Sequence, residues 1–177
     1  MMRKMIKTAA VAATLAAGTL AFAISQASAR AAGDPARDTA GETERNRALV
    51  KQGMQAWADG TGSPYDLLAE NARWTITGNS AASRTYPSKE AFLSEVIRPF
   101  NARMRDRLIP SVHAYYAEGD TVIVHFDAKG TARDGKPYVN SYAWILRMQD
   151  GKIVEAHAFF DAIAFNDLWS RVSPTRD

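Results

Sequence analysis

The stretch that decides the fold is YVNSYAWILRMQDGKIVEAHAFFD, residues 138–161. β-Branched and aromatic residues fill both halves, and Asp150-Gly151 separates them with a dipeptide that strongly favours a tight hairpin turn. Aromatic, histidine, asparagine and aspartate side chains recur at every second position of both halves. Because alternate residues of a strand point to the same side, this spacing predicts that one face of a sheet carries them all.

Further strands are predicted on the N-terminal side of this hairpin. Residues 111–117 and 121–131 show the same alternation, and Gly119-Asp120 and Asp134-Gly135 provide the turns of an antiparallel meander. Residues 72–77, which end before Gly78, form an earlier strand.

Helical periodicity predicts helices over residues 42–59, 64–69 and 162–171. Another helix starts after Ser88, a good N-cap, and bends or ends near Arg98 because Pro99 follows. Helices followed by a curled antiparallel sheet make an α+β domain.

Two-residue turns at both Asp-Gly dipeptides would fix the register of three neighbouring strands. One face would then carry the rows His125-Trp144-His157, Asp127-Tyr142-Phe159 and Lys129-Asn140-Asp161, with opposed side chains about 5 Å apart. The other face would be almost entirely apolar and would contain Val124, Phe126, Ala128, Ala143, Ile145, Val154, Ala156, Ala158 and Phe160. A one-residue slip, for instance through a bulge, would scramble these rows.

The polar face is either the wall of a pocket or a solvated surface. Trp144, Tyr142 and Phe159 in its middle favour a pocket, because a solvated face seldom gathers bulky aromatic groups. Both faces are too hydrophobic for open water, so we expect helices to cover one and a second subunit to cover the other. Trp74 and Trp57 are predicted to line the apolar part of the pocket, with core packing as the alternative.

Asp161 is the best candidate for an acid/base. A carboxyl group walled by Phe159, Phe160 and Trp144 would be partly desolvated, which raises its pKa towards the useful range. The same carboxylate would also serve as the cap of the helix that begins at Ala162. Asn140, opposite Asp161, is expected to orient it.

The other polar candidates each have a functional and a structural interpretation. His157 and His125 would move protons or hold a polar ligand, or else act as hydrogen-bonded structural groups. Asp127 opposite Tyr142 would polarise a carbonyl, or form a satisfied buried hydrogen bond. The three histidines lack metal-ligand spacing, and there is no phosphate-binding glycine loop, nucleophile elbow or cysteine, so we expect no metal and no cofactor.

The N-terminus has the pattern of a secretory signal peptide. Basic residues up to Lys7 precede an apolar stretch and the triplet Ala27-Ser28-Ala29, which predicts cleavage after Ala29. An uncleaved anchor is the alternative, but the stretch is short and alanine-rich for a spanning helix. The polar residues 30–41 are predicted to be a flexible linker before one domain over residues 42–177. We therefore expect a secreted or periplasmic protein without stable membrane insertion.

The charge balance excludes one class of partner. Three of the 22 Lys and Arg residues and none of the 19 Asp and Glu residues lie in the predicted signal peptide, so the remaining chain has no net charge. Such a chain is not expected to bind nucleic acid or an anionic membrane surface. Without cysteine, an exported domain must be held together by its core.

Several motifs resemble the SnoaL-like branch of the nuclear transport factor 2 superfamily, which also contains ketosteroid isomerase. They are the Trp74 strand ending at Gly78, the Gly-x-Pro-Tyr element over residues 135–138, NSY, DGKIVE and FFDAIAFNDLW. The resemblance covers about residues 44–174. It implies a cone-shaped curved sheet wrapped around N-terminal helices, and a homodimer through the outer sheet face. It also implies that Asp161, at the matching position of the last strand, faces the cavity as an acid/base.

The chain departs from ketosteroid isomerase, because its WTITG strand has no carboxylate and its first helix no tyrosine. Two functions are favoured over a structural or purely protein-binding role, both with a small, mostly apolar molecule that carries one or two oxygen functions. One is a cofactor-independent lyase, isomerase or hydrolase, in which Asp161 moves a proton while His157, Tyr142 and Asp127 hold or polarise the substrate. The other is a non-catalytic binding or carrier protein that uses the same pocket.

Overall fold

The computed structural model describes residues 35–174, with side chains from residue 39 onward. The predicted signal peptide and its cleavage site lie outside the described residues. In chain order the elements are α1 (Pro35–Asp59), η1 (Pro64–Leu67), β1 (Leu68–Ile76), β2 (Thr85–Tyr86), α2 (Lys89–Phe92), η2 (Leu93–Ile97), α3 (Arg98–Asn101), β3 (Ile109–Glu118), β4 (Thr121–Thr131), β5 (Pro137–Gln149), β6 (Lys152–Phe160) and α4 (Ala162–Arg171).

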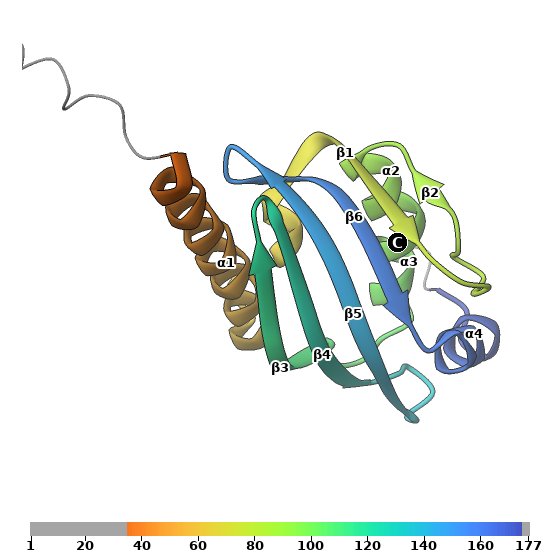
Figure 1. Ribbon diagram of the computed structural model, residues 1–177. Coiled ribbons are helices and arrows are strands. Elements are labelled where there is room, and N and C mark those ends of the chain that lie inside the picture. Colours follow the sequence, from red (N-terminus) through yellow and green to blue (C-terminus); the bar gives the residue numbers. More distant parts are fainter. Residues whose placement is uncertain (1–34, 175–177) are drawn as a thin grey trace, which may run out of the picture. The chain divides into compact units, whose positions relative to one another are not determined.

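Six strands form one curved sheet in the order β2-β1-β6-β5-β4-β3 (Figure 1). The predicted α+β class and the antiparallel meander from β3 to β6 are confirmed. The sequence did not indicate how β1 joins this meander: it pairs in parallel with β6, and β2 pairs antiparallel with β1. The first strand therefore lies beside the last one, which brings Trp74 next to Ala156.

Helices lie on the inner face of the curved sheet, so its two faces differ. α1 packs on β3 and β4, while α2 packs on β1 and α4 on β5 (Figure 1). α1 begins at Pro35, before the predicted start at residue 42, and proline suits a first helical turn because it needs no N–H partner there. None of the helices among residues 35–174 is long and apolar enough to cross a bilayer.

The helix after Ser88 contains a wide turn. Ser88 is its N-cap as predicted and accepts from the Ala91 N–H at 3.1 Å. η2 is a π-helix, in which the Arg98 N–H donates to the Leu93 carbonyl, and it precedes Pro99. Proline lacks the N–H of an α-helical bond, so the chain widens by one residue here instead of ending.

The predicted register is wrong by one residue between β4 and β5. Asp134-Gly135 belongs to a three-residue loop, because Ala132 bonds to Lys136 and Gly135, with φ of 83°, occupies the left-handed position. His125 therefore pairs with Ala143 instead of Trp144. A glycine bulge at the end of such a loop is a common alternative to the two-residue turn.

The register between β5 and β6 is correct only next to the turn. Asp150 and Gly151 both have positive φ, as a two-residue turn requires, and Gln149 pairs with Lys152. A bulge at Val154 then shifts the remaining pairs, so that Trp144 lies opposite Ala158 instead of His157. One extra residue in a strand moves every later side chain to the other face.

The two shifts separate the residues of the predicted polar face. Tyr142 and Trp144 share the inner face with Phe126 on β4 and Ala158 on β6, and all four are buried. This inner face forms the core with the helices. The outer face carries His125, Asp127, His157 and Phe159.

Candidate functional site

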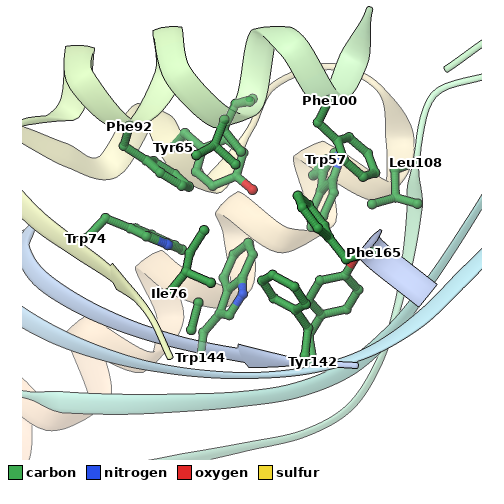
Figure 2. Close-up of a pocket in the computed structure, with 14 residues that line it drawn as sticks. Trp57, Tyr65, Trp74, Ile76, Phe92, Phe100, Leu108, Tyr142, Trp144 and Phe165 are labelled. Carbon is green, nitrogen blue, oxygen red and sulfur yellow. The ribbon is translucent and has the colours of Figure 1, made fainter. Parts of the chain in front are cut away.

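A cavity of about 60 Å³ lies between the inner sheet face and the helices. Figure 2 shows that Tyr65, Phe92 and Phe100 approach it from the helical side and Trp74, Trp144 and Tyr142 from the sheet. The 14 residues that line it are Trp57, Tyr65, Trp74, Ile76, Phe92, Val96, Ile97, Phe100, Leu108, Tyr142, Trp144, Ala158, Phe160 and Phe165. None of them is charged, so the only hydrogen-bonding side-chain groups of the lining are phenol hydroxyls and indole N–H groups.

Aromatic rings pack directly on one another around this cavity. Trp144 stacks on Trp57 with ring centroids 6.0 Å apart and planes within 7°, and meets Trp74 edge-on at 5.2 Å. Trp74 in turn stacks on Phe92 at 4.4 Å. These offset and edge-on arrangements are favourable for aromatic rings and give the cavity flat, rigid walls.

A buried chain of hydrogen bonds runs along the inner face of β5 to the cavity. The Asn140 amide Nδ2 donates to the Tyr138 hydroxyl at 2.9 Å, and the Tyr138 and Tyr142 hydroxyls are 3.0 Å apart. Both hydroxyls are buried, and either can be the donor of the hydrogen bond between them. When Tyr138 donates, the Tyr142 proton is free to be donated into the cavity.

Burial keeps these phenols protonated. Desolvation raises the pKa of Tyr142 well above its ordinary value, and it raises the pKa of Tyr65 and Tyr138 in the same direction. At neutral pH, Tyr65 and Tyr142 are therefore neutral hydrogen-bond donors for an oxygen atom of a ligand.

Four of the predicted site residues line the cavity: Trp57, Trp74, Tyr142 and Trp144. Asn140 is outside the lining and is linked to it through the hydroxyls of Tyr138 and Tyr142. Its side chain does not hold the Asp161 carboxylate. Its amide instead brackets the Asp161 backbone, because Nδ2 donates to the Asp161 carbonyl at 3.0 Å and Oδ1 accepts from the Asp161 N–H at 2.9 Å. Asn140 thus fixes the junction between β6 and α4.

Four other predicted site residues do not face the cavity. His125, Asp127, His157 and Phe159 are on the outer sheet face because of the two register shifts. Asp127 accepts from the Ser141 hydroxyl at 2.6 Å and pairs with His113 at 2.8 Å, instead of meeting Tyr142. Both hydrogen bonds lower the pKa of Asp127, and the bond from Ser141 has the larger effect.

Asp161 occupies the position of the N-cap of α4. Its carboxylate Oδ1 accepts from the Ile163 N–H at 2.8 Å, and the side chain is exposed and outside the cavity lining. The structure therefore supports the capping interpretation that the sequence left open, and the expected wall of Phe159, Phe160 and Trp144 around this carboxylate is not formed. A role of Asp161 in proton transfer stays a prediction.

Apart from Trp57 on α1, the residues on the helical side of the cavity were not among the predicted site residues. Tyr65 follows Pro64 in a short 3₁₀-helix, and Phe100 follows Pro99 in α3. Phe92 and Val96 were visible as the apolar side of a helix, but the pattern alone does not say that this side lines a cavity. Within residues 39–174, no three His, Asp or Glu side chains converge closely enough to hold a metal ion.

Comparison with protein families gives one match, to the SnoaL-like domain over residues 46–156. This match spans more than half of the chain. The chain belongs to the SnoaL-like domain family. Comparison with curated proteins finds no match.

Solved structures with the same fold support this assignment. Bal32a, from a soil-derived mobile gene cassette, has a TM-score of 0.60 and 22% identity over 72% of this chain and 98% of its own. An NTF2-like protein of Burkholderia thailandensis E264 has a TM-score of 0.58 and 25% identity over 70% and 95%. A Jannaschia sp. CCS1 protein, provisionally described as a SnoaL-like polyketide cyclase, has a TM-score of 0.59 and 16% identity over 79% and 97%. The SnoaL-like chain thus has an NTF2-like fold, which accommodates small molecules.

Proposed function

We propose that this SnoaL-like protein binds a small, mostly apolar molecule through one oxygen atom, and that it does so as a binding or carrier protein. The observation that carries the proposal is the lining of the cavity, where aromatic and aliphatic groups surround phenol donors without a carboxylate or imidazole. An apolar pocket with a few convergent polar groups is the usual form of a small-molecule site. General acid–base catalysis, in contrast, is most efficient with a group whose pKa lies near the operating pH, and burial raises the pKa of Tyr65 and Tyr142 away from it.

Catalysis remains the second candidate because the Jannaschia protein carries a cyclase description. In that case Asp161 would have to act on a substrate that extends beyond the cavity, since its carboxylate is outside the lining. Recovery of a chemically intact ligand after incubation supports the carrier, whereas conversion that disappears in Asp161→Asn supports the enzyme.

The hydroxyl of Tyr142 is expected to distinguish an oxygenated ligand from a hydrocarbon. 4-Methylphenol and toluene are suitable probes because they differ by one oxygen. Tyr142→Phe should weaken 4-methylphenol binding about fivefold, the equivalent of about 1 kcal/mol for one hydrogen bond, and leave toluene binding unchanged. Tyr116→Phe, at a residue 61% exposed on β3, is the matched control.

The four tryptophans provide the readout in ¹H–¹⁵N NMR titrations. Trp57, Trp74 and Trp144 line the cavity, and Trp169 on α4 is outside the lining. The indole N–H signals of the first three should shift with either probe, while that of Trp169 should not. Equal weakening of both probes by Tyr142→Phe would contradict a role of its hydroxyl, and no shift with 4-methylphenol would contradict the proposed pocket.

A homodimer through the outer sheet face is part of the proposal. Val139 is 61% exposed, and Phe159 and Ile109 are 41% and 40% exposed, although all three lie on strands of the sheet. A second copy would remove these apolar groups from water. Export is also part of the proposal, with a mature chain that starts at Arg30. The family resemblance supports the same interface.

Native mass spectrometry of protein recovered from the exported fraction tests assembly and export together. The expected mass is that of two chains that each begin at Arg30, and Val139→Asp should give single chains because it places a charge in the interface. A wild-type monomer would argue against the dimer. A chain that still carries residues 1–29 would argue against the predicted cleavage.

A further inference from the structure

A second, wider cleft of about 370 Å³ adjoins the cavity. Five residues line both spaces: Trp57, Tyr65, Ile97, Phe100 and Leu108. For comparison, an apolar cavity of about 150 Å³ holds a benzene molecule. The inner cavity of about 60 Å³ is therefore too small to enclose a ring by itself, and a bound ring must extend towards this outer cleft.

The wide turn of η2 shapes the wall that separates the two spaces. Val96 lines the inner cavity, Leu93 the outer cleft, and Ile97 both. Tyr65, like Ile97, lines both the cavity and the cleft. The next residue of η1, Asp66, lines only the outer cleft. A ligand that is anchored by the inner phenols and extends past Tyr65 would therefore reach the part of the cleft that Asp66 lines.

The outer cleft differs from the cavity in its chemistry. Ser63, Asp66 and Asn101 contribute polar side chains, and Asp66 is the only charged residue of the lining. Asp66 is held in place by a capping box, in which its Oδ2 accepts from the Ser63 N–H at 3.0 Å while the Ser63 hydroxyl accepts from the Tyr65 N–H at 3.1 Å. The carboxylate is therefore fixed at the cleft by its own helix.

Two cations close to this segment are directed at backbone carbonyls, and among residues 39–174 neither forms an ion pair with the Asp66 carboxylate. Lys152 Nζ donates to the Asp66 backbone oxygen at 3.4 Å. The Arg107 guanidinium donates to the carbonyls of Trp57 and Ala58 at 2.7 Å each, at the C-terminal end of α1. Neither cation lines the cleft.

From this arrangement we propose the class of ligand: an amphipathic molecule whose apolar, oxygen-bearing end fills the inner cavity and whose other end is a hydrogen-bond donor, cationic or neutral, against Asp66. A carboxylate or phosphate at that end is disfavoured by repulsion from Asp66. This inference rests on the proposed binding function and adds the charge of the ligand to it.

Three small phenols test the inference because they share one ring and differ in the para substituent. 4-Methylphenol is neutral, tyramine carries an ammonium group and 4-hydroxyphenylacetate carries a carboxylate. In the indole NMR titration at low, fixed ionic strength, tyramine should bind about threefold to tenfold more tightly than 4-hydroxyphenylacetate, with 4-methylphenol between them.

Asp66→Asn should reduce the ratio between the charged probes to less than about twofold, because the amide keeps the acceptor for the Ser63 N–H and loses only the charge. Asp120→Asn removes the same charge from the turn between β3 and β4, outside the cleft, and should leave the ratio unchanged. If 4-methylphenol does not bind, the proposed function fails. If it binds while 4-hydroxyphenylacetate equals or exceeds tyramine in the wild type, only the inference about charge is overturned.

Discussion

Replacing Trp144 by alanine is expected to lower the free energy of unfolding by about 3 to 5 kcal/mol, the range for truncation of a large buried aromatic side chain. Trp144 is 4% exposed, stacks on Trp57 and meets Trp74 and Phe126 edge-on. The alanine variant would leave an empty space next to a cavity that already exists, and rigid aromatic neighbours cannot collapse into it easily.

Urea denaturation at one fixed protein concentration measures this change. Trp144→Phe should recover more than half of the lost free energy, because a smaller ring still packs between Trp57 and Phe126. Ile163→Ala, at a residue 82% exposed on α4, should change the free energy of unfolding by less than about 0.5 kcal/mol. A loss below about 1 kcal/mol for Trp144→Ala would contradict its place at the centre of the aromatic wall.

The same contacts explain why the core could be predicted from the sequence better than the site. Strict alternation places Tyr142 and Trp144 on one face whatever the neighbouring strands do, and both line the cavity. The helix over Ala162–Arg171 and the strand over Thr121–Thr131 have the predicted bounds, because clear caps and turns delimit them. Local periodicity thus predicted these elements and which of their residues share a face, whereas β2 was not predicted and β1 begins at Leu68, before the predicted residue 72.

Pairing between strands could not be predicted in the same way. A third residue in the loop before Lys136 and one bulged residue, Val154, were sufficient to move His125, Asp127 and His157 away from the cavity. Asp-Gly occurs in two-residue turns and in longer loops with a glycine bulge, so the dipeptide does not define the loop length. The parallel pairing of β1 with β6 joins segments far apart in the chain, and no local pattern records it.

Asn140→Leu is expected to cost about 2 to 4 kcal/mol of unfolding free energy, although leucine has nearly the same size and is more hydrophobic. Asn140 is 3% exposed, and its amide satisfies the N–H and carbonyl of Asp161 and the hydroxyl of Tyr138. Leucine would leave the Asp161 N–H without this partner, which costs about 1 to 3 kcal/mol for a buried group and less where water can enter. The Asp161 carbonyl keeps its bond from the Phe165 N–H and the Tyr138 hydroxyl keeps its bond with Tyr142, so each of these two groups loses one hydrogen bond, worth about 0.5 to 1.5 kcal/mol.

The neighbouring residue on the same strand provides the control. Ser141 is exposed on the outer face, where it donates one hydrogen bond to Asp127. Ser141→Ala should therefore cost less than about 1 kcal/mol in the same urea experiment. Equal losses for Asn140→Leu and Ser141→Ala would contradict the role of Asn140 at the junction of β6 and α4.

Asn140→Asp distinguishes the donor function of the amide from its shape. A neutral carboxyl group at this position donates one hydrogen bond and accepts another, whereas a carboxylate only accepts and faces the Asp161 carbonyl. Folding therefore favours the neutral form and raises the pKa of the introduced carboxyl above its value in the unfolded chain. The stability of this variant relative to wild type is then highest at acid pH and falls as the pH rises through that raised pKa. Urea denaturation of both proteins between pH 4 and pH 8, chosen as roughly the range spanned by shifted carboxyl groups, measures the difference. A constant difference would mean that shape alone, without the donor, matters at this position.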